Sequence, residues 1–164
     1  MKRATDLLVR PARADDAAAL AEVLHETFES TWRPAITAAA AEAMRREDRP
    51  RAYVAERGAE FWLAEAVGEV LGLVHWQGDF VHALHVRPAY ARRGVGARLM
   101  DHAEGEIAAA GFACVRLETD TFNRPARAFY RARGYREAGR YPDQEWASGL
   151  TTVLLVKTLA TSSP

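Results

Sequence analysis

The hydrophobic positions of this chain repeat at two spacings, one typical of strands and one typical of helices. Seven short apolar runs have strand length: 7–10, 61–66, 70–77, 80–86, 114–119, 135–138 and 150–159. Helical spacing marks four segments: from the capping pair Asp15 and Asp16 to Phe28, and then 36–46, 94–110 and 123–133. The stretch 47–58, which contains Pro50, is predicted to be a loop.

The order of these elements predicts a mixed sheet within one domain. The runs 61–66, 70–77 and 80–86 are separated by short glycine-bearing connections, so we expect an antiparallel meander. Strands and helices then alternate. We predict an α/β (mixed α+β) fold whose mostly antiparallel sheet has about six or seven strands flanked by helices. The 164 residues have the size of one domain, with a core at about 7–159 and a flexible tail at 160–164.

Charge and cysteine content disfavour several kinds of partner. The 22 basic and 22 acidic residues balance, which removes the usual electrostatic argument for a nucleic-acid or anionic-membrane partner. No apolar run reaches the roughly 18 residues of a membrane span, and no signal peptide is recognised, so we expect a cytoplasmic protein. The single cysteine, Cys114, lies in an apolar run without other metal-ligand residues, which favours a core position and no metal site.

The segment most informative about function is a basic glycine turn between a predicted strand and the longest predicted helix. It reads Ala-Arg-Arg-Gly-Val-Gly-Ala over 91–97. Free amides at a helix start, the positive end of the helix dipole and nearby arginines together favour a bound phosphate or pyrophosphate. A Rossmann fingerprint needs a third glycine where this chain has Leu99, and the Gly-Lys-Ser/Thr of a P-loop is absent. Those two nucleotide-binding folds are therefore disfavoured.

These residues resemble the GCN5-related N-acetyltransferase (GNAT) superfamily, in which strand four leads through a Gln/Arg-x-x-Gly-x-Gly/Ala loop into helix three. The first motif position falls on Ala91, so that side chain of Gln or Arg is missing, although two arginines follow it. A second motif comes in the expected order: Asn123, then Ala-x-x-Phe-Tyr ending at Tyr130, then the pair Gly134 and Tyr135. The resemblance covers 7–159, and the stretch 32–58 has no motif of its own.

The resemblance implies an acetyl-CoA site between splayed strands four and five, with the pantetheine arm in the gap and the pyrophosphate on the glycine turn. The residues it implies for cofactor binding are Leu84, His85, Val86, Arg92, Arg93, Gly94, Val95, Gly96, Ala97, Asn123 and Tyr130. Outside this family context, Asn123 is interpreted as a helix cap and Tyr130 as a core aromatic residue.

Transfer of an acetyl group to an amine needs a polarised thioester carbonyl, an uncharged amine and a proton for the leaving thiolate. The resemblance implies that Tyr130 supplies that proton and that a strand-four amide, of Leu84 or a neighbour, polarises the carbonyl. No covalent intermediate is required, so we expect direct attack in a ternary complex.

The base that removes the amine proton is the least defined part of the mechanism. His82 is the first candidate, because we expect it to share a strand face with Leu84 and Val86, and some relatives acting on aryl-substituted amines carry a similarly placed histidine. A non-catalytic strand histidine is an equal interpretation of His82. Glu118, His85 and a chain of water molecules are the alternatives.

The acceptor site is expected near the end of the first helix, where Phe28 and Trp32 lie, with Trp76 and the aromatic residues of 141–146 as further walls. Each of these aromatic residues taken singly is also a candidate core residue. Such walls favour an apolar or aromatic amine over a highly charged polyamine, which would require a cluster of carboxylates.

The sequence thus predicts an acetyl-CoA-dependent N-acetyltransferase acting on a primary amine, with a small molecule as the expected acceptor. Three alternatives stay open: a protein or peptide amine as acceptor, a non-catalytic acyl-CoA sensor, and a nucleotide-binding domain unrelated to CoA. A homodimer is common in the family and compatible with the terminal β segment.

Overall fold

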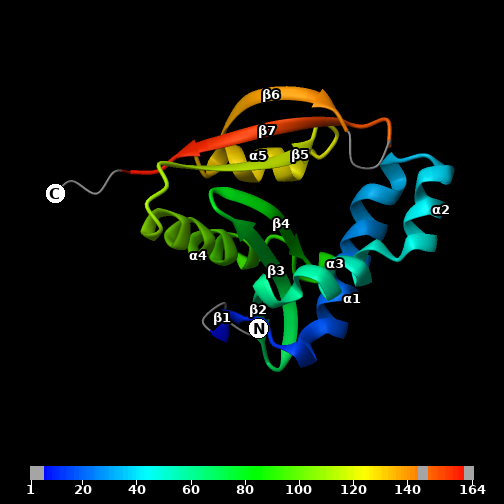
Figure 1. The fold of residues 1–164 in the computed structure, drawn as a ribbon, viewed down its shortest axis with the longest axis horizontal. Helices are drawn as coiled ribbons and strands as arrows, with labels where there is room; N and C mark the ends of the chain where they lie inside the picture. Colours follow the sequence, from blue (N-terminus) through cyan, green and yellow to red (C-terminus); the bar gives the residue numbers. More distant parts are fainter. Residues whose placement is uncertain (1–5, 144–147, 161–164) are drawn as a thin grey trace.

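The protein is described by a computed structural model that covers residues 6–143 and 148–160. The strands are β1 (Leu8–Pro11), β2 (Trp62–Ala66), β3 (Glu69–Gln77), β4 (Phe80–Val86), β5 (Cys114–Asp120), β6 (Arg136–Pro142) and β7 (Thr151–Thr158). The helices are α1 (Ala17–Thr27), α2 (Ala38–Glu47), α3 (Arg49–Arg57), α4 (Val95–Ala109) and α5 (Arg124–Ala132). Figure 1 shows them arranged around one sheet, which confirms the predicted mixed fold.

The sheet has seven strands in the order β1-β2-β3-β4-β5-β7-β6, and every neighbouring pair is antiparallel except β4 and β5. These two parallel strands each contain seven residues, yet they pair only at Phe80 with Arg116 and at Val81 with Leu117. Beyond those pairs the strands separate. The predicted splay between strands four and five is therefore confirmed.

Two apolar cores lie on the two faces of the sheet. On one face α1 and α3 pack through Leu20, Val23 and Val54. On the other face α4 and α5 contribute Leu99 and Tyr130 among other residues. The helices therefore cover both faces of the sheet around the opening between β4 and β5.

The predicted loop over 47–58 is wrong, because most of it forms α3. Asp48 takes a left-handed conformation, with φ at 42°, and separates α2 from α3. Pro50 lies in the first turn of α3, where its missing N–H breaks no intrahelical hydrogen bond. Val54 then anchors the helix in the core with 7% of its surface exposed. A proline that was interpreted as a loop signal is in fact a helix start.

The predicted face of His82 is also wrong, because β4 contains a β-bulge at this residue. His75 of β3 pairs with Ala83 and Trp76 pairs with Val81, so His82 is an extra residue between the two pairs. The ring of His82 lies against His75, with centroids 5.3 Å apart, on the side of α3. Leu84 and Val86 instead pack against the core formed with α4.

Smaller differences concern the ends of the chain. The sixth strand extends to Pro142, beyond the predicted 135–138. Apart from Ala160, the predicted tail at 160–164 lies outside the described residues. Within 6–143 and 148–160, no helix is long and apolar enough to cross a membrane.

Candidate active site

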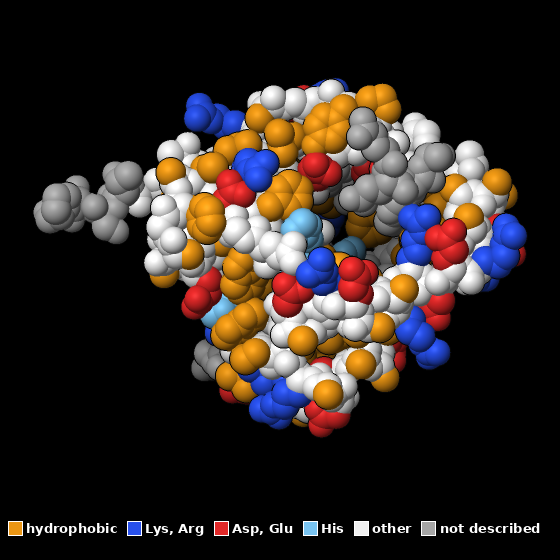
Figure 2. Space-filling model, viewed as in Figure 1, with side chains coloured by type: hydrophobic (Ala, Val, Ile, Leu, Met, Phe, Trp, Pro, Cys, Tyr) orange, Lys and Arg blue, Asp and Glu red, His pale blue; other side chains and the backbone are white. Residues whose placement is uncertain are grey.

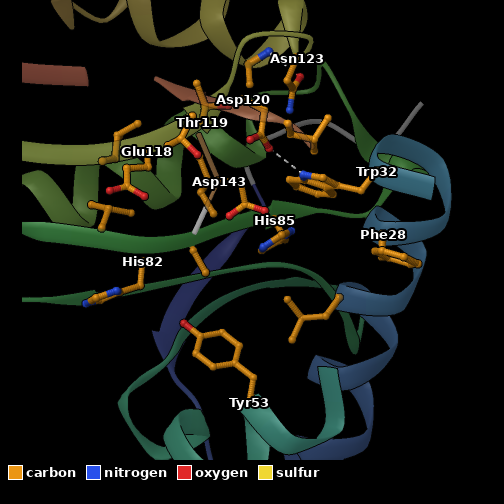
Figure 3. Close-up of a pocket in the computed structure, with 18 of the residues that line it drawn as sticks. Phe28, Trp32, Tyr53, His82, His85, Glu118, Thr119, Asp120, Asn123 and Asp143 are labelled. Carbon is orange, nitrogen blue, oxygen red and sulfur yellow. Dashed lines mark hydrogen bonds between the residues drawn. The ribbon is translucent and has the colours of Figure 1, made fainter. Parts of the chain in front are cut away.

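A cavity of about 600 Å³ occupies the opening between β4 and β5. Its walls come from α1 and the π-helical turn that follows it, from α3 and α5, and from both strands. Aromatic and polar side chains dominate the lining: Phe28, Trp32, Tyr53, Phe80, His82, His85, Glu118, Thr119, Asp120, Asn123, Tyr130, Tyr141 and Asp143. Figure 2 shows acidic, basic and histidine side chains together around a hollow on this face, and Figure 3 shows the lining residues. Since α3 and α5 cover opposite faces, the cavity passes through the sheet.

Trp32 connects the two sides of the cavity. It ends the π-helical turn Phe28–Trp32, a distortion that proteins frequently use at functional sites. Its indole Nε1 donates a hydrogen bond to Oδ2 of Asp120 on β5 at 3.0 Å (Figure 3). Its ring also lies 5.6 Å from the ring of His85 on β4. The indole therefore spans the mouth of the gap at the point where both strands have separated.

His85 is held by the end of α1. Its Nδ1 lies 2.9 Å from the hydroxyl of Thr27, and that hydroxyl donates to the carbonyl oxygen of Leu24 at 3.1 Å. Burial lowers the pKa of His85 to about 4, so the imidazole is neutral at neutral pH. The structure thus brings His85 into the cavity as a neutral side chain, in addition to the backbone role that the family resemblance implied.

Three carboxylates line the cavity: Glu118, Asp120 and Asp143. Desolvation raises the pKa of Asp120, the hydrogen bond from Trp32 opposes this shift, and the other two carboxylates raise the pKa further. Arg49 lies in the same lining and adds a positive charge. The sequence favours aromatic walls without a carboxylate cluster, whereas the structure combines both kinds of wall.

Tyr130 and Asn123 approach the cavity from the α5 side. Tyr130 is 8% exposed and packs edge-on against Phe129 and Tyr135, and burial raises the pKa of its hydroxyl above the usual 10. A hydroxyl with such a pKa stays protonated at neutral pH and can donate a proton or a hydrogen bond. Oδ1 of Asn123 accepts a hydrogen bond from the amide of Ala126 at 3.2 Å, so this residue caps α5 as well as lining the cavity.

The glycine turn lies at the start of α4, outside the cavity lining. Arg92 has a φ of 62° and Gly94 a φ of 83°, so the chain passes through two left-handed residues before the helix begins. The first hydrogen bond of the helix is donated by the amide of Arg98 to the carbonyl oxygen of Gly94, at 3.1 Å. The amides of the first three helical residues, from Val95 to Ala97, have no acceptor inside the helix. Together with exposed Arg92 and Arg93, this arrangement fits a bound pyrophosphate.

One aromatic residue that the sequence placed in the site lies elsewhere. Trp76 packs against Trp62 and His102 beside α4, and it is not among the residues that line the cavity. The side chain of Val86 packs against the core, and the expected role of this residue concerns its backbone. His82 does line the cavity; its side chain is exposed, and its ring stacks on His75 and lies tilted against Phe80.

Some lining residues had no signal in the sequence. Tyr53 belongs to α3, the helix that was interpreted as a loop, and its hydroxyl hydrogen-bonds His75 Nδ1 at 2.5 Å. Asp120 ends β5 and Asp143 follows β6, and only the fold brings them together. Trp146, another expected wall, lies outside the described residues. Within the described ranges, no three His, Cys, Asp or Glu side chains are arranged to hold a metal ion.

The chain is similar to known acetyltransferases in sequence and in fold. The model of the acetyltransferase (GNAT) family matches residues 17–135, which is more than half of the chain. A blasticidin-S acetyltransferase of Streptomyces morookaense is 37% identical over 95 residues, covering 58% of this chain and 68% of that protein. A peptidyl-lysine N-acetyltransferase of Escherichia coli (strain K12), YiaC, is 35% identical over 85 residues, covering 51% and 53%.

A solved structure gives the same fold. The PaiA N-acetyltransferase of Thermoplasma acidophilum, in complex with coenzyme A, superposes with a TM-score of 0.73 at 18% identity, covering 93% of this chain and 99% of that chain. The splayed sheet, the glycine turn at α4 and the match of the family model agree with one another. The chain belongs to the acetyltransferase (GNAT) family and is an acetyl-transferring enzyme.

Proposed function

We propose that this enzyme transfers the acetyl group of acetyl-CoA to a primary amine of a small molecule, by direct attack within a ternary complex. The observation that carries the proposal is the cavity that passes through the sheet between β4 and β5. A donor bound from the α4 and α5 side and an amine bound from the α1 and α3 side can meet inside it. The relative named for blasticidin S supports a small-molecule acceptor.

Acetyl-CoA supplies a thioester whose carbonyl an uncharged amine can attack and whose thiolate then leaves. The turn from Arg92 to Ala97 holds the pyrophosphate through free amides and two guanidinium groups. Leu84, His85 and Val86 offer the pantetheine arm a strand edge that β5 leaves unpaired. An amide on this edge, such as that of Leu84, also provides a donor for the carbonyl oxygen.

Tyr130 donates the proton that the departing thiolate needs. Its raised pKa keeps the hydroxyl protonated, and its position beside Asn123 in the lining brings it to the α5 side of the cavity. His82 lies at the exposed rim, so in this proposal it contributes to amine deprotonation through solvent rather than from inside the cavity.

The lining favours an amine that combines an apolar body with positive charge. Phe28, Trp32 and Tyr53 offer aromatic surface, and Asp120 and Asp143 offer carboxylates nearby. A carboxylate whose pKa is raised by burial gains most from a cationic ligand, because the ligand offsets the desolvation of its charge. We therefore expect aromatic amines with a second basic group to be better acceptors than either simple alkyl amines or neutral aryl amines.

The test measures acetyl-CoA binding and thiol release on the same preparation. Acetyl-CoA is expected to raise the melting temperature through ligand linkage, and ATP is not. Thiol release is then followed with phenethylamine, spermidine, blasticidin S and a lysine-containing peptide. Release with one of the small molecules supports the proposal. Release with the peptide alone moves the acceptor to a protein amine, and stabilisation without release by any acceptor favours the acyl-CoA sensor.

Variants of the turn test the cofactor site separately. Removal of the two guanidinium groups in Arg92→Ala/Arg93→Ala weakens acetyl-CoA binding, by about tenfold if the lost attraction is about 1.4 kcal/mol. The matched control is Arg45→Ala on α2, whose guanidinium is 58% exposed and pairs only with Glu42 among the described residues. Equal affinities in the variant and the control contradict the assigned pyrophosphate site.

A further inference from the structure

The hydroxyl of Thr27 determines which nitrogen of His85 carries the proton. A threonine hydroxyl has one proton to donate, and Thr27 gives it to the carbonyl oxygen of Leu24 at 3.1 Å. The same oxygen is 2.9 Å from Nδ1 of His85. While that proton lies on the Leu24 carbonyl, the oxygen accepts from the imidazole and Nδ1 donates. This arrangement favours the Nδ1-protonated tautomer, in which Nε2 carries a lone pair.

The lone pair on Nε2 of His85 is directed towards the cavity. Nδ1 faces α1, so Nε2 is on the ring edge directed away from the helix, and His85 is among the residues that line the cavity. Figure 3 shows its ring projecting from β4 next to Trp32. Among the described residues none hydrogen-bonds Nε2. An acceptor atom is thus held ready for a ligand N–H.

We propose that His85 is a substrate-positioning residue: Nε2 accepts a hydrogen bond from the acceptor amine, in a tautomer that Thr27 fixes. This assignment rests on the proposed function, since it concerns the acceptor side of the same cavity. It differs from a general-base role. The N–H of the amine donates to Nε2, and this hydrogen bond holds the amine nitrogen in place. The imidazole resists protonation, so it does not keep the proton that the amine loses.

The geometry also explains why Trp32 packs on His85. An imidazole with one ring nitrogen bonded and an indole packed beside it at 5.6 Å has less freedom to rotate or flip. Both restraints come from the end of α1 and the turn after it. The direction of Nε2 is therefore set by the α1 segment, while the backbone of His85 remains part of β4.

The first test reads the tautomer without turnover. Nitrogen-15 spectra of the histidine side chains distinguish Nδ1-protonated, Nε2-protonated and doubly protonated rings, and the His85→Gln spectrum identifies the His85 signals. We expect the Nδ1-protonated neutral form at pH 7, and Thr27→Ser keeps it because it keeps the hydroxyl. Thr27→Val removes the acceptor and shifts the population towards the Nε2-protonated form. An Nε2-protonated or charged His85 in the unmodified protein overturns the proposal.

The second test uses phenethylamine added to the protein with coenzyme A. The Nε2 signal of His85 is expected to move as the amine donates to it, and a signal that does not respond up to the solubility limit overturns the assignment. In kinetic assays His85→Leu and Thr27→Val each raise the KM for the amine by about tenfold, as one lost hydrogen bond predicts, and by more than the KM for acetyl-CoA. An unchanged amine KM in His85→Leu also overturns it.

Thr31→Val is the matched control for Thr27→Val. It makes the same chemical change four residues later, at a hydroxyl whose recorded partner is Ser30 and which does not line the cavity. Failure of the proposed function gives a different pattern: the predicted tautomer and the response to phenethylamine are present, yet no amine is acetylated.

Discussion

The pairing of β3 with β4 at Gly72 allows a prediction with a worked magnitude. Gly72 of β3 pairs with Val86 of β4, and a methyl group added at Gly72 would lie 2.7 Å from the carbonyl oxygen of His85. It would also lie 3.2 Å from Cδ1 of Leu99 and 3.3 Å from Cγ2 of Val86. Carbon and oxygen atoms of adjacent strands normally stay about 3.3–3.6 Å apart, so the backbone contact is short by about 0.6 Å.

Gly72→Ala must therefore displace one strand, because a carbonyl oxygen cannot move like the end of a side chain. Overpacking of this kind costs about 1–3 kcal/mol. Alanine also reduces the conformational entropy of the unfolded chain, which stabilises the folded protein by about 0.4–1 kcal/mol. We expect a net loss of about 1–2 kcal/mol, and a melting temperature lower by about 2–8 °C for a domain of this size. Because the displaced strand carries His85, the KM for acetyl-CoA should rise as well.

Chemical denaturation and thermal melting measure the change in stability, with Gly105→Ala as the matched control. Gly105 lies within α4, where an added methyl group meets nothing within 4 Å, so alanine there should stabilise the protein by about 0.5–1 kcal/mol. If Gly72→Ala is as stable as the unmodified protein, the close approach of β3 and β4 and the magnitude derived from it are refuted.

Three further predictions concern the cavity. Tyr130→Phe removes the proposed proton donor and should lower kcat by about 100-fold or more in steady-state kinetics. Urea denaturation should show a change in stability of less than about 1 kcal/mol. An unchanged kcat excludes the role of Tyr130 as proton donor. Between pH 6.5, the unperturbed pKa, and about 4, the unfolded chain binds a proton at His85 that the folded protein does not, so stability falls as pH falls. In His85→Gln that loss should be smaller in denaturation curves across the same range, and an identical slope contradicts the burial of a neutral imidazole. The raised pKa of Asp120 gives the opposite pH dependence, because the folded protein loses stability as pH rises above 3.8. Asp120→Asn should therefore have a higher melting temperature than the unmodified protein at neutral pH, and this difference should shrink in acid. A constant difference at all pH values would exclude this cause.

The sheet was predictable because its strands are encoded locally. Each strand forms a short apolar run bounded by turn residues, and the glycine turn before α4 marks the point where β4 ends. The order of these runs was enough to predict a mixed sheet, and the family motifs added the splay. These features depend on residues close together in the chain.

The rest of the site depends on contacts between distant segments. The bulge at His82 changes which face each β4 side chain takes, and it follows from the pairing with β3 rather than from the β4 sequence. α3 begins with an Arg-Pro-Arg sequence that carries no apolar helical repeat, and its packing on the sheet comes from Val54 and Tyr53 further along. Asp120 and Asp143 come together only when β6 and β7 have folded back beside β5.

The incomplete pairing of β4 and β5 has a consequence for how the protein behaves in storage and at high concentration. Two strands that separate leave two rows of backbone donors and acceptors that are not satisfied by each other. Exposed strand edges of this kind are templates for intermolecular β-pairing and aggregation. Here both edges lie inside the sheet, where the indole of Trp32 bridges the mouth of the opening. A ligand lying along the β4 edge would cap these groups, so the protein should self-associate less when saturated with a coenzyme A derivative than when purified alone.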